Sequence, residues 1–168
     1  MIKLTGICIL FLAARLFYEN YIDKNEETAK KAENIILFSD LLYVNVMELK
    51  MPLERGISSL KFKISPFIDE FIENVTSKCA ENPHLSVREI FLKQFSKINA
   101  DRKIKREMNR FFSVVGNSDK ETVLSYKKIA VKNCEAYLAE YRRNSENKRK
   151  TAGAMTFGVS AILTIILL

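Results

Sequence analysis

The residues able to do metal or thiol chemistry are few and scattered in this chain. It has one histidine, His84, and three cysteines, Cys8, Cys79 and Cys134. A structural or catalytic metal site needs three or four ligands, and these four residues do not form a spacing that such sites use. We therefore expect no metal site, and we interpret the cysteines as reduced packing residues without a disulfide framework.

The motifs of common catalytic and nucleotide-binding sites are also missing from the sequence. There is no Gly-x-x-x-x-Gly-Lys-Ser/Thr motif, so we expect no P-loop, and no Gly-x-Ser-x-Gly motif. A single histidine leaves no basis for a Ser or Cys triad. Neighbouring carboxylates such as Asp69-Glu70 do not face each other on a helix, so they form no acid–base pair. We predict no catalytic residues and no cofactor, which disfavours an enzyme acting on membrane lipids.

A cluster of basic residues is the strongest candidate for recognising a partner. The chain has 27 Lys and Arg against 20 Asp and Glu, a net charge of +7, and the excess falls within 24–150. The cluster follows Asp101 and comprises Arg102, Lys103, Lys105, Arg106 and Arg110. It could be a solvated helix start, a dock for an acidic partner or anionic lipid, or a nucleic-acid site. No aromatic residue interleaves with it, so nucleic acid is the least favoured reading.

Both ends of the chain are apolar and predict membrane helices. Residues 151–168 carry no charge, and eighteen helical residues span about 27 Å, close to the bilayer's hydrocarbon core. Residues 1–22 hold a shorter apolar centre between Lys3 and Arg15, which we interpret as an uncleaved membrane helix. A basic membrane collar precedes the C-terminal run, formed by Arg142, Arg143, Lys148, Arg149 and Lys150.

The membrane collar predicts the orientation, because basic segments next to membrane helices stay on the cytoplasmic side. The central domain, 23–150, is then cytoplasmic, and both termini lie on the far side of the membrane. We also expect the first and last helices of this domain to lie side by side, since both lead into the membrane.

The central domain is predicted to be all-α, an antiparallel helical bundle flanked by the two transmembrane helices. Apolar residues recur every three or four positions, and neither hairpin signals nor sustained alternation occur. Helices are expected from about Asp23 to Lys50, over 53–62, from Pro66 to the break at Asn82-Pro83, from Ser86 to about Ile98, over 103–115, and over 122–143.

Local residues set the expected helix ends. Pro52 ends the first helix, Ser65 caps the helix that starts at Pro66, and Ser86 forms a capping box with Glu89. Further along, Gly116 provides a left-handed stop. Ser118 is expected to cap the last helix, with Glu121 three residues later.

Several short motifs resemble one family in their order and spacing. Gly116-Asn117-Ser118-Asp119 looks like a Gly-x-Ser-Asp signature, and Pro52-Leu53-Glu54 looks like the start of Pro-Leu-x-Glu-Ala. Arg55-Gly56 departs from that pattern, and Val123 stands where glutamine is expected. Similar tail residues are Glu135-Ala136, Asn147-Lys148, Gly153 and Gly158. Over nearly its whole length the chain resembles the stage III sporulation protein AB family.

The resemblance implies a component of the channel that links mother cell and forespore, on the mother-cell side. It implies a soluble domain similar to the cytoplasmic domain of the type II secretion F platform protein. It also implies that the protein is located in the mother-cell membrane. The implied partners are the stage III sporulation protein AA ATPase and other channel components. The resulting hypothesis is a non-enzymatic scaffold that docks this ATPase. The alternative is a membrane-tethered basic domain that binds nucleic acid or anionic lipid.

Overall fold

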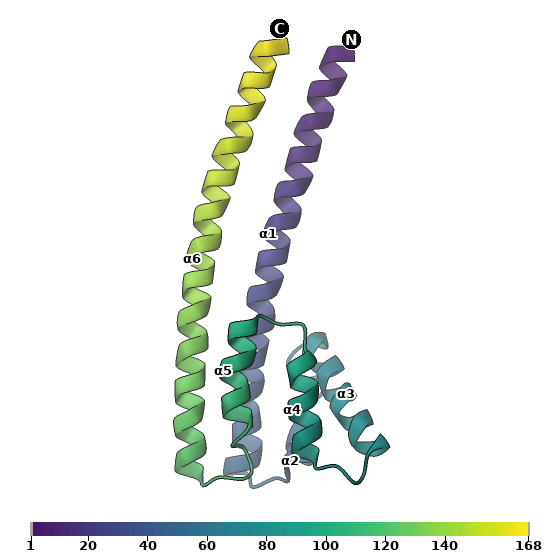
Figure 1. Ribbon diagram of the computed structural model, residues 1–168, viewed down its shortest axis with the longest axis vertical. Coiled ribbons are helices and arrows are strands. Elements are labelled where there is room, and N and C mark those ends of the chain that lie inside the picture. Colours follow the sequence, from purple (N-terminus) through teal and green to yellow (C-terminus); the bar gives the residue numbers. More distant parts are fainter. Residues whose placement is uncertain (1, 168) are drawn as a thin grey trace. The chain divides into compact units, whose positions relative to one another are not determined.

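The computed structural model describes the backbone of residues 2–167 and the side chains of residues 15–16, 23–151 and 158. Every regular element in this part of the chain is a helix, which confirms the all-α prediction (Figure 1). The elements are α1 (Ile2–Tyr43), the π-helix η1 (Val44–Glu48), α2 (Leu53–Ser58), α3 (Pro66–Glu81), α4 (Val87–Lys97), α5 (Arg102–Phe112) and α6 (Lys120–Leu167). They form two compact units. One is Lys30–Leu138, and the other combines Met1–Ala29 with Ala139–Leu168.

A cluster of phenylalanines forms the core of the Lys30–Leu138 unit. Phe91 of α4 is fully buried, and its ring centroid lies 5.1–6.5 Å from those of four other rings. These rings are Phe38 of α1, Phe71 of α3, Phe95 of α4 and Phe112 of α5. Aromatic pairs at these distances add to the stabilisation from apolar burial, so one cluster joins four helices.

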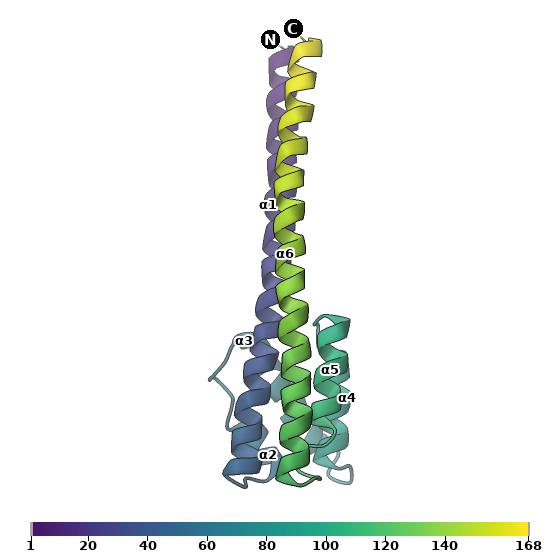
Figure 2. The same ribbon diagram turned by 90° about the vertical axis from the view of Figure 1, so that its left-hand side faces the viewer.

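Helices α1 and α6 lie side by side and antiparallel within the Lys30–Leu138 unit, as predicted (Figure 2). Lys127 Nζ lies 2.9 Å from Asp40 Oδ1, and Lys120 Nζ lies 2.6 Å from Glu48 Oε2. The second contact holds the pKa of Glu48 below its ordinary value and raises that of Lys120. Because residue numbers rise on one helix as they fall on the other, the two helices run in opposite directions.

Most predicted helix ends are confirmed, because short-range residues determine them. Pro66 occupies the first turn of α3, Asn82 ends that helix, and Ser86 Oγ accepts a hydrogen bond from Glu89 N at 3.2 Å. Ser65 precedes α3 as predicted, but its side chain makes no capping hydrogen bond.

Several ends differ from the predictions. Helix α5 ends at Phe112 rather than at Val115. The first helix changes to π geometry at Val44 and ends at Glu48 rather than Lys50, which has a left-handed φ of 54°. Helix α2 ends at Ser58 instead of Phe62, which also has a positive φ. Helix α6 continues from Lys120 to Leu167, so one helix includes the predicted last helix, the membrane collar and the C-terminal apolar run.

Gly116 has the predicted left-handed backbone, with a φ of 75°, but α5 already ends at Phe112. The cap of α6 is corrected from Ser118 to Asp119. Asp119 Oδ1 accepts a hydrogen bond from Thr122 N at 2.9 Å. The backbone N–H groups of Asn117 and Ser118 both bond to Val114 O, at 3.2 Å, within the preceding turn. Ser118 is therefore part of the turn, and α6 starts at Lys120, two residues before the predicted range of 122–143. The bond from Thr122 holds the pKa of Asp119 below its ordinary value.

The two predicted membrane helices, 1–22 and 151–168, lie almost wholly outside the residues whose side chains are described. In the part of the chain that the structure describes, we find no helix with the length and apolar character needed to cross a bilayer. The two membrane helices remain predictions.

Replacing Phe91 by alanine is expected to lower the free energy of unfolding by about 3–5 kcal/mol, because it empties the centre of the phenylalanine cluster. The matched control is Phe62→Ala, since that side chain is 80% exposed. Its effect should be within about 0.5 kcal/mol. Urea unfolding of the full-length protein measures both values, and equal losses would contradict the proposed core.

Replacing Asp119 by alanine is expected to destabilise the protein more than Ser118→Ala, because only Asp119 bonds to the first turn of α6. Comparison of the two urea midpoints tests this difference. A larger loss in Ser118→Ala would restore Ser118 as the cap.

Candidate functional site

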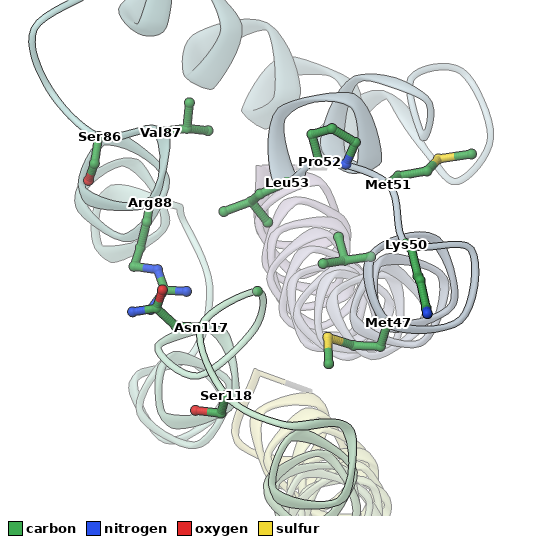
Figure 3. Close-up of a pocket in the computed structure, with 12 residues that line it drawn as sticks. Met47, Lys50, Met51, Pro52, Leu53, Ser86, Val87, Arg88, Asn117 and Ser118 are labelled. Carbon is green, nitrogen blue, oxygen red and sulfur yellow. The ribbon is translucent and has the colours of Figure 1, made fainter.

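A pocket in the Lys30–Leu138 unit brings together the two stretches most similar to the family signatures (Figure 3). Its volume is about 610 Å³. Three segments line it: the chain from η1 to α2, the first turn of α4, and the loop before α6. The lining residues are Val46, Met47, Lys50, Met51, Pro52, Leu53, Ser86, Val87, Arg88, Gly116, Asn117 and Ser118.

Arg88 attaches α4 to the loop that carries the Gly-x-Ser-Asp signature. Its Nη1 donates to Ser113 O at 2.9 Å, and its Nη2 donates to Val115 O at 2.5 Å. These carbonyls follow the last turn of α5, where backbone oxygens lack partners within the helix. In Figure 3 the guanidinium lies beside Asn117. Nothing in the sequence predicts this role of Arg88, because no local pattern indicates a contact with residues so far along the chain.

Val46 forms the base of the pocket and contacts both of its neighbouring glycine positions. A Cβ at Gly56 would lie 2.8 Å from Val46 Cγ2, so α2 and η1 pack too closely for any larger residue without movement. A Cβ at Gly116 would lie 3.7 Å from Val46 Cγ1. Asn45 also donates to Gly56 O, at 3.2 Å. The glycine that departs from the family pattern thus has a packing role here.

The pocket is electropositive. Two of its lining residues, Lys50 and Arg88, are cations, and none is a carboxylate. Lys50 also has the left-handed backbone noted above, which is uncommon for residues other than glycine, asparagine and aspartate. Beside it, a π-helix occupies the turn before the pocket, and π-helical turns are frequent at functional sites.

The predicted basic cluster lies on α5 and is organised by a buried carboxylate, Glu107. This residue is only 8% exposed, and it accepts a hydrogen bond from Asn133 Nδ2 of α6 at 3.0 Å. Arg106 Nε lies 3.2 Å from Glu107 Oε1, and Arg110 Nη1 lies 3.3 Å from Glu107 Oε2. The bond from Asn133, followed by those from the arginines, holds the pKa of Glu107 below its ordinary value. Glu107 therefore stays ionised and orients two exposed guanidinium groups.

The other cluster residues have different surroundings. Asp101 caps α5 through Lys103 N at 2.7 Å and accepts a hydrogen bond from Tyr137 OH at 2.9 Å. Lys103 Nζ lies 4.8 Å from the centre of the Tyr137 ring. Lys105 Nζ donates to the carbonyls of Ser96 and Ile98, at 3.3 and 3.2 Å, at the C-terminal end of α4. Lys105 therefore supports the fold, whereas Arg102 is exposed on the surface.

The remaining candidate residues belong to neither site. Cys79 and Cys134 are free, and burial raises the pKa of the Cys134 thiol to about 12, which keeps it protonated and unreactive. His84 is exposed between α3 and α4, and we find no group of three possible metal ligands among the described side chains. Cys8 lies outside these residues. The membrane collar is exposed along α6 in the Met1–Ala29 and Ala139–Leu168 unit.

Comparison with known proteins gives one match. The family model described as stage III sporulation protein AB matches residues 3–168. No curated protein and no solved structure matches the chain. The family match covers both the pocket and the α5 cluster.

The Glu107 network predicts a loss of stability in acid. A carboxylate whose folded pKa is lowered stabilises the protein above its ordinary pKa, here 4.5. That contribution is lost as the pH falls through the lowered folded value. In Glu107→Gln the free energy of unfolding should therefore fall less below about pH 4.5 than it does in the wild type. Part of the fall should remain, because the pKa values of Asp119 and Glu48 are also lowered.

Urea unfolding at a series of pH values measures this dependence. The control is Glu70→Gln, which neutralises an exposed carboxylate on α3 and should keep the wild-type profile. An unchanged profile in Glu107→Gln would show that Glu107 ionises equally in the folded and unfolded states.

Proposed function

The chain belongs to the stage III sporulation protein AB family, and from this membership we propose that it is a non-enzymatic, membrane-anchored platform that docks a cytoplasmic ATPase. Membership implies a part in the sporulation channel apparatus and an association with the mother-cell membrane. The anchors, the orientation and the ATPase partner are our proposals. The described residues provide no constellation that would favour catalysis over a scaffold role.

The proposed anchors are the apolar runs 1–22 and 151–168. Helical backbone extends through both runs, to Ile2 in α1 and to Leu167 in α6. Tyr141 OH donates to Asn25 Oδ1 at 2.8 Å, which joins α6 before the C-terminal run to α1 just after the N-terminal run. The exposed membrane collar suits the anionic cytoplasmic surface of a membrane. These features favour two anchors that enter the membrane from the same side.

The observation that carries the docking proposal is the ordered basic surface of α5. Arg106 and Arg110 have side chains 64% and 61% exposed, yet both are oriented by Glu107. Ile129 and Tyr126 lie four and seven residues before Asn133, on the same face of α6, and are 56% and 44% exposed. Ordered cations beside exposed apolar side chains suit an acidic protein surface with an apolar centre.

The same geometry disfavours nucleic acid and anionic lipid as partners of this cluster. Lys103 lies over Tyr137, Lys105 bonds to α4 carbonyls, and two arginines contact Glu107. Phosphate binding benefits most from unpaired cations that neutralise several phosphates at once. If the full-length protein nevertheless binds DNA at low salt, with affinity falling steeply as salt rises, the nucleic-acid alternative gains support.

Reversing the charge of Arg102 and Arg106 together is expected to weaken binding to the purified stage III sporulation protein AA ATPase by about tenfold or more. Lys105 is left unchanged because its bonds support α4. The matched control reverses Lys63 and Lys93, two exposed lysines outside α5 and α6. A quantitative pull-down measures binding, and urea unfolding checks the fold. Wild-type binding by the Arg102 and Arg106 variant would rule out this surface as the dock.

A further inference from the structure

The pocket between η1, α4 and the Gly116 loop combines two kinds of surface. Half of its twelve lining residues are apolar: Val46, Met47, Met51, Pro52, Leu53 and Val87. Two are cations and three are polar, whereas none is acidic. A volume of about 610 Å³ lies in the range of sites that enclose small ligands or several side chains. The lining therefore suits a partly apolar, negatively charged occupant.

Arg88 provides an oriented cation in this pocket. Two of its N–H groups donate to Ser113 O and Val115 O, and a guanidinium has five such donors. The two carbonyls fix the side chain before any ligand arrives, so binding costs little conformational entropy. The planar fork matches a carboxylate well, because two parallel hydrogen bonds can form.

The apolar side of the pocket is adaptable. Met47 and Met51 line it together with Leu53, and methionine side chains adjust to irregular partners. Lys50, the second cation, follows them in the chain with its left-handed φ of 54°. Non-glycine residues in this conformation concentrate at active sites and ligand clamps.

We propose that this pocket binds a peptide carboxylate next to an aliphatic side chain, with the carboxylate held by Arg88, the aliphatic group on Met47 and Leu53, and Lys50 adding positive charge on the opposite side of the pocket. An inorganic anion would leave the apolar half of the pocket in contact with water, which favours a peptide. The carboxylate can belong to an internal acidic residue or to a chain terminus. This site shares no residue with the α5 cluster, so it is independent of the ATPase dock.

The test measures fluorescence anisotropy of labelled peptides with the full-length protein in detergent. The first probe alternates glutamate and leucine and has a blocked C-terminus. The second carries leucines and a free C-terminal carboxylate. The comparison peptide replaces each glutamate by glutamine and has a blocked C-terminus. Saturable binding of either acidic probe is expected, whereas the comparison peptide should bind about tenfold more weakly, as for a lost charge-assisted hydrogen bond.

Lys50→Gln is the first variant, because it removes a charge from an exposed side chain without breaking the Arg88 contacts. It should weaken binding about tenfold. Lys93→Gln, on an exposed position of α4 outside the pocket, is the matched control and should bind as the wild type. Leu53→Ser tests the apolar half and should also weaken binding.

Each result has a defined meaning. Binding of only the first or only the second probe identifies an internal acidic residue or a chain terminus as the source of the carboxylate. Equal affinities of the wild type, Lys50→Gln and Leu53→Ser would overturn the proposal. If inorganic phosphate displaces the peptide and Leu53→Ser binds the peptide as tightly as the wild type does, the site is a simple anion site. That result would also overturn the proposal.

Discussion

The bonds from Arg88 to Ser113 O and Val115 O are the contacts on which much of the structure depends. They join α4 to the end of α5 and provide partners for carbonyls that would otherwise lose hydrogen bonds on folding. They also hold the turn at Gly116 from which α6 begins. The start of α6 in turn brings Lys120 to Glu48 and Lys127 to Asp40 on α1. One arginine thus connects the signature loop, the pocket and the pairing of the two longest helices.

The sequence was sufficient to predict features that depend on neighbouring residues. Pro66, Asn82 and Ser86 mark helix ends through ring geometry or capping, and the structure confirms all three. The left-handed backbone of Gly116 is also confirmed, although α5 ends before it, at Phe112. Features that depend on distant contacts were not predictable. The π-helix η1 fits against Gly56 of α2, and the buried carboxylate of Glu107 requires Asn133 of α6. The cap moved from Ser118 to Asp119 because the Gly116 turn uses one more residue than the capping pattern assumes.

The structure gives the signature stretches a physical meaning beyond helix capping. Gly116-Asn117-Ser118 and Pro52-Leu53 are separate in the sequence but line one pocket. The basic cluster is more than a row of charges along α5. It is a surface on which Glu107 and Asp101 determine what the cations contact. The proposed platform role needs stable, ordered surfaces more than reactive groups, and the α5 cluster provides such a surface.

The central claim is that the α5 surface docks the ATPase of the sporulation channel. Amide hydrogen exchange of the full-length protein, measured with and without the purified ATPase, tests it most directly because it reports every helix at once. We expect slower exchange in α5 and in the part of α6 around Tyr126 and Asn133 when the ATPase is bound. Unchanged exchange in these segments, with protection elsewhere in the Lys30–Leu138 unit, would contradict the account.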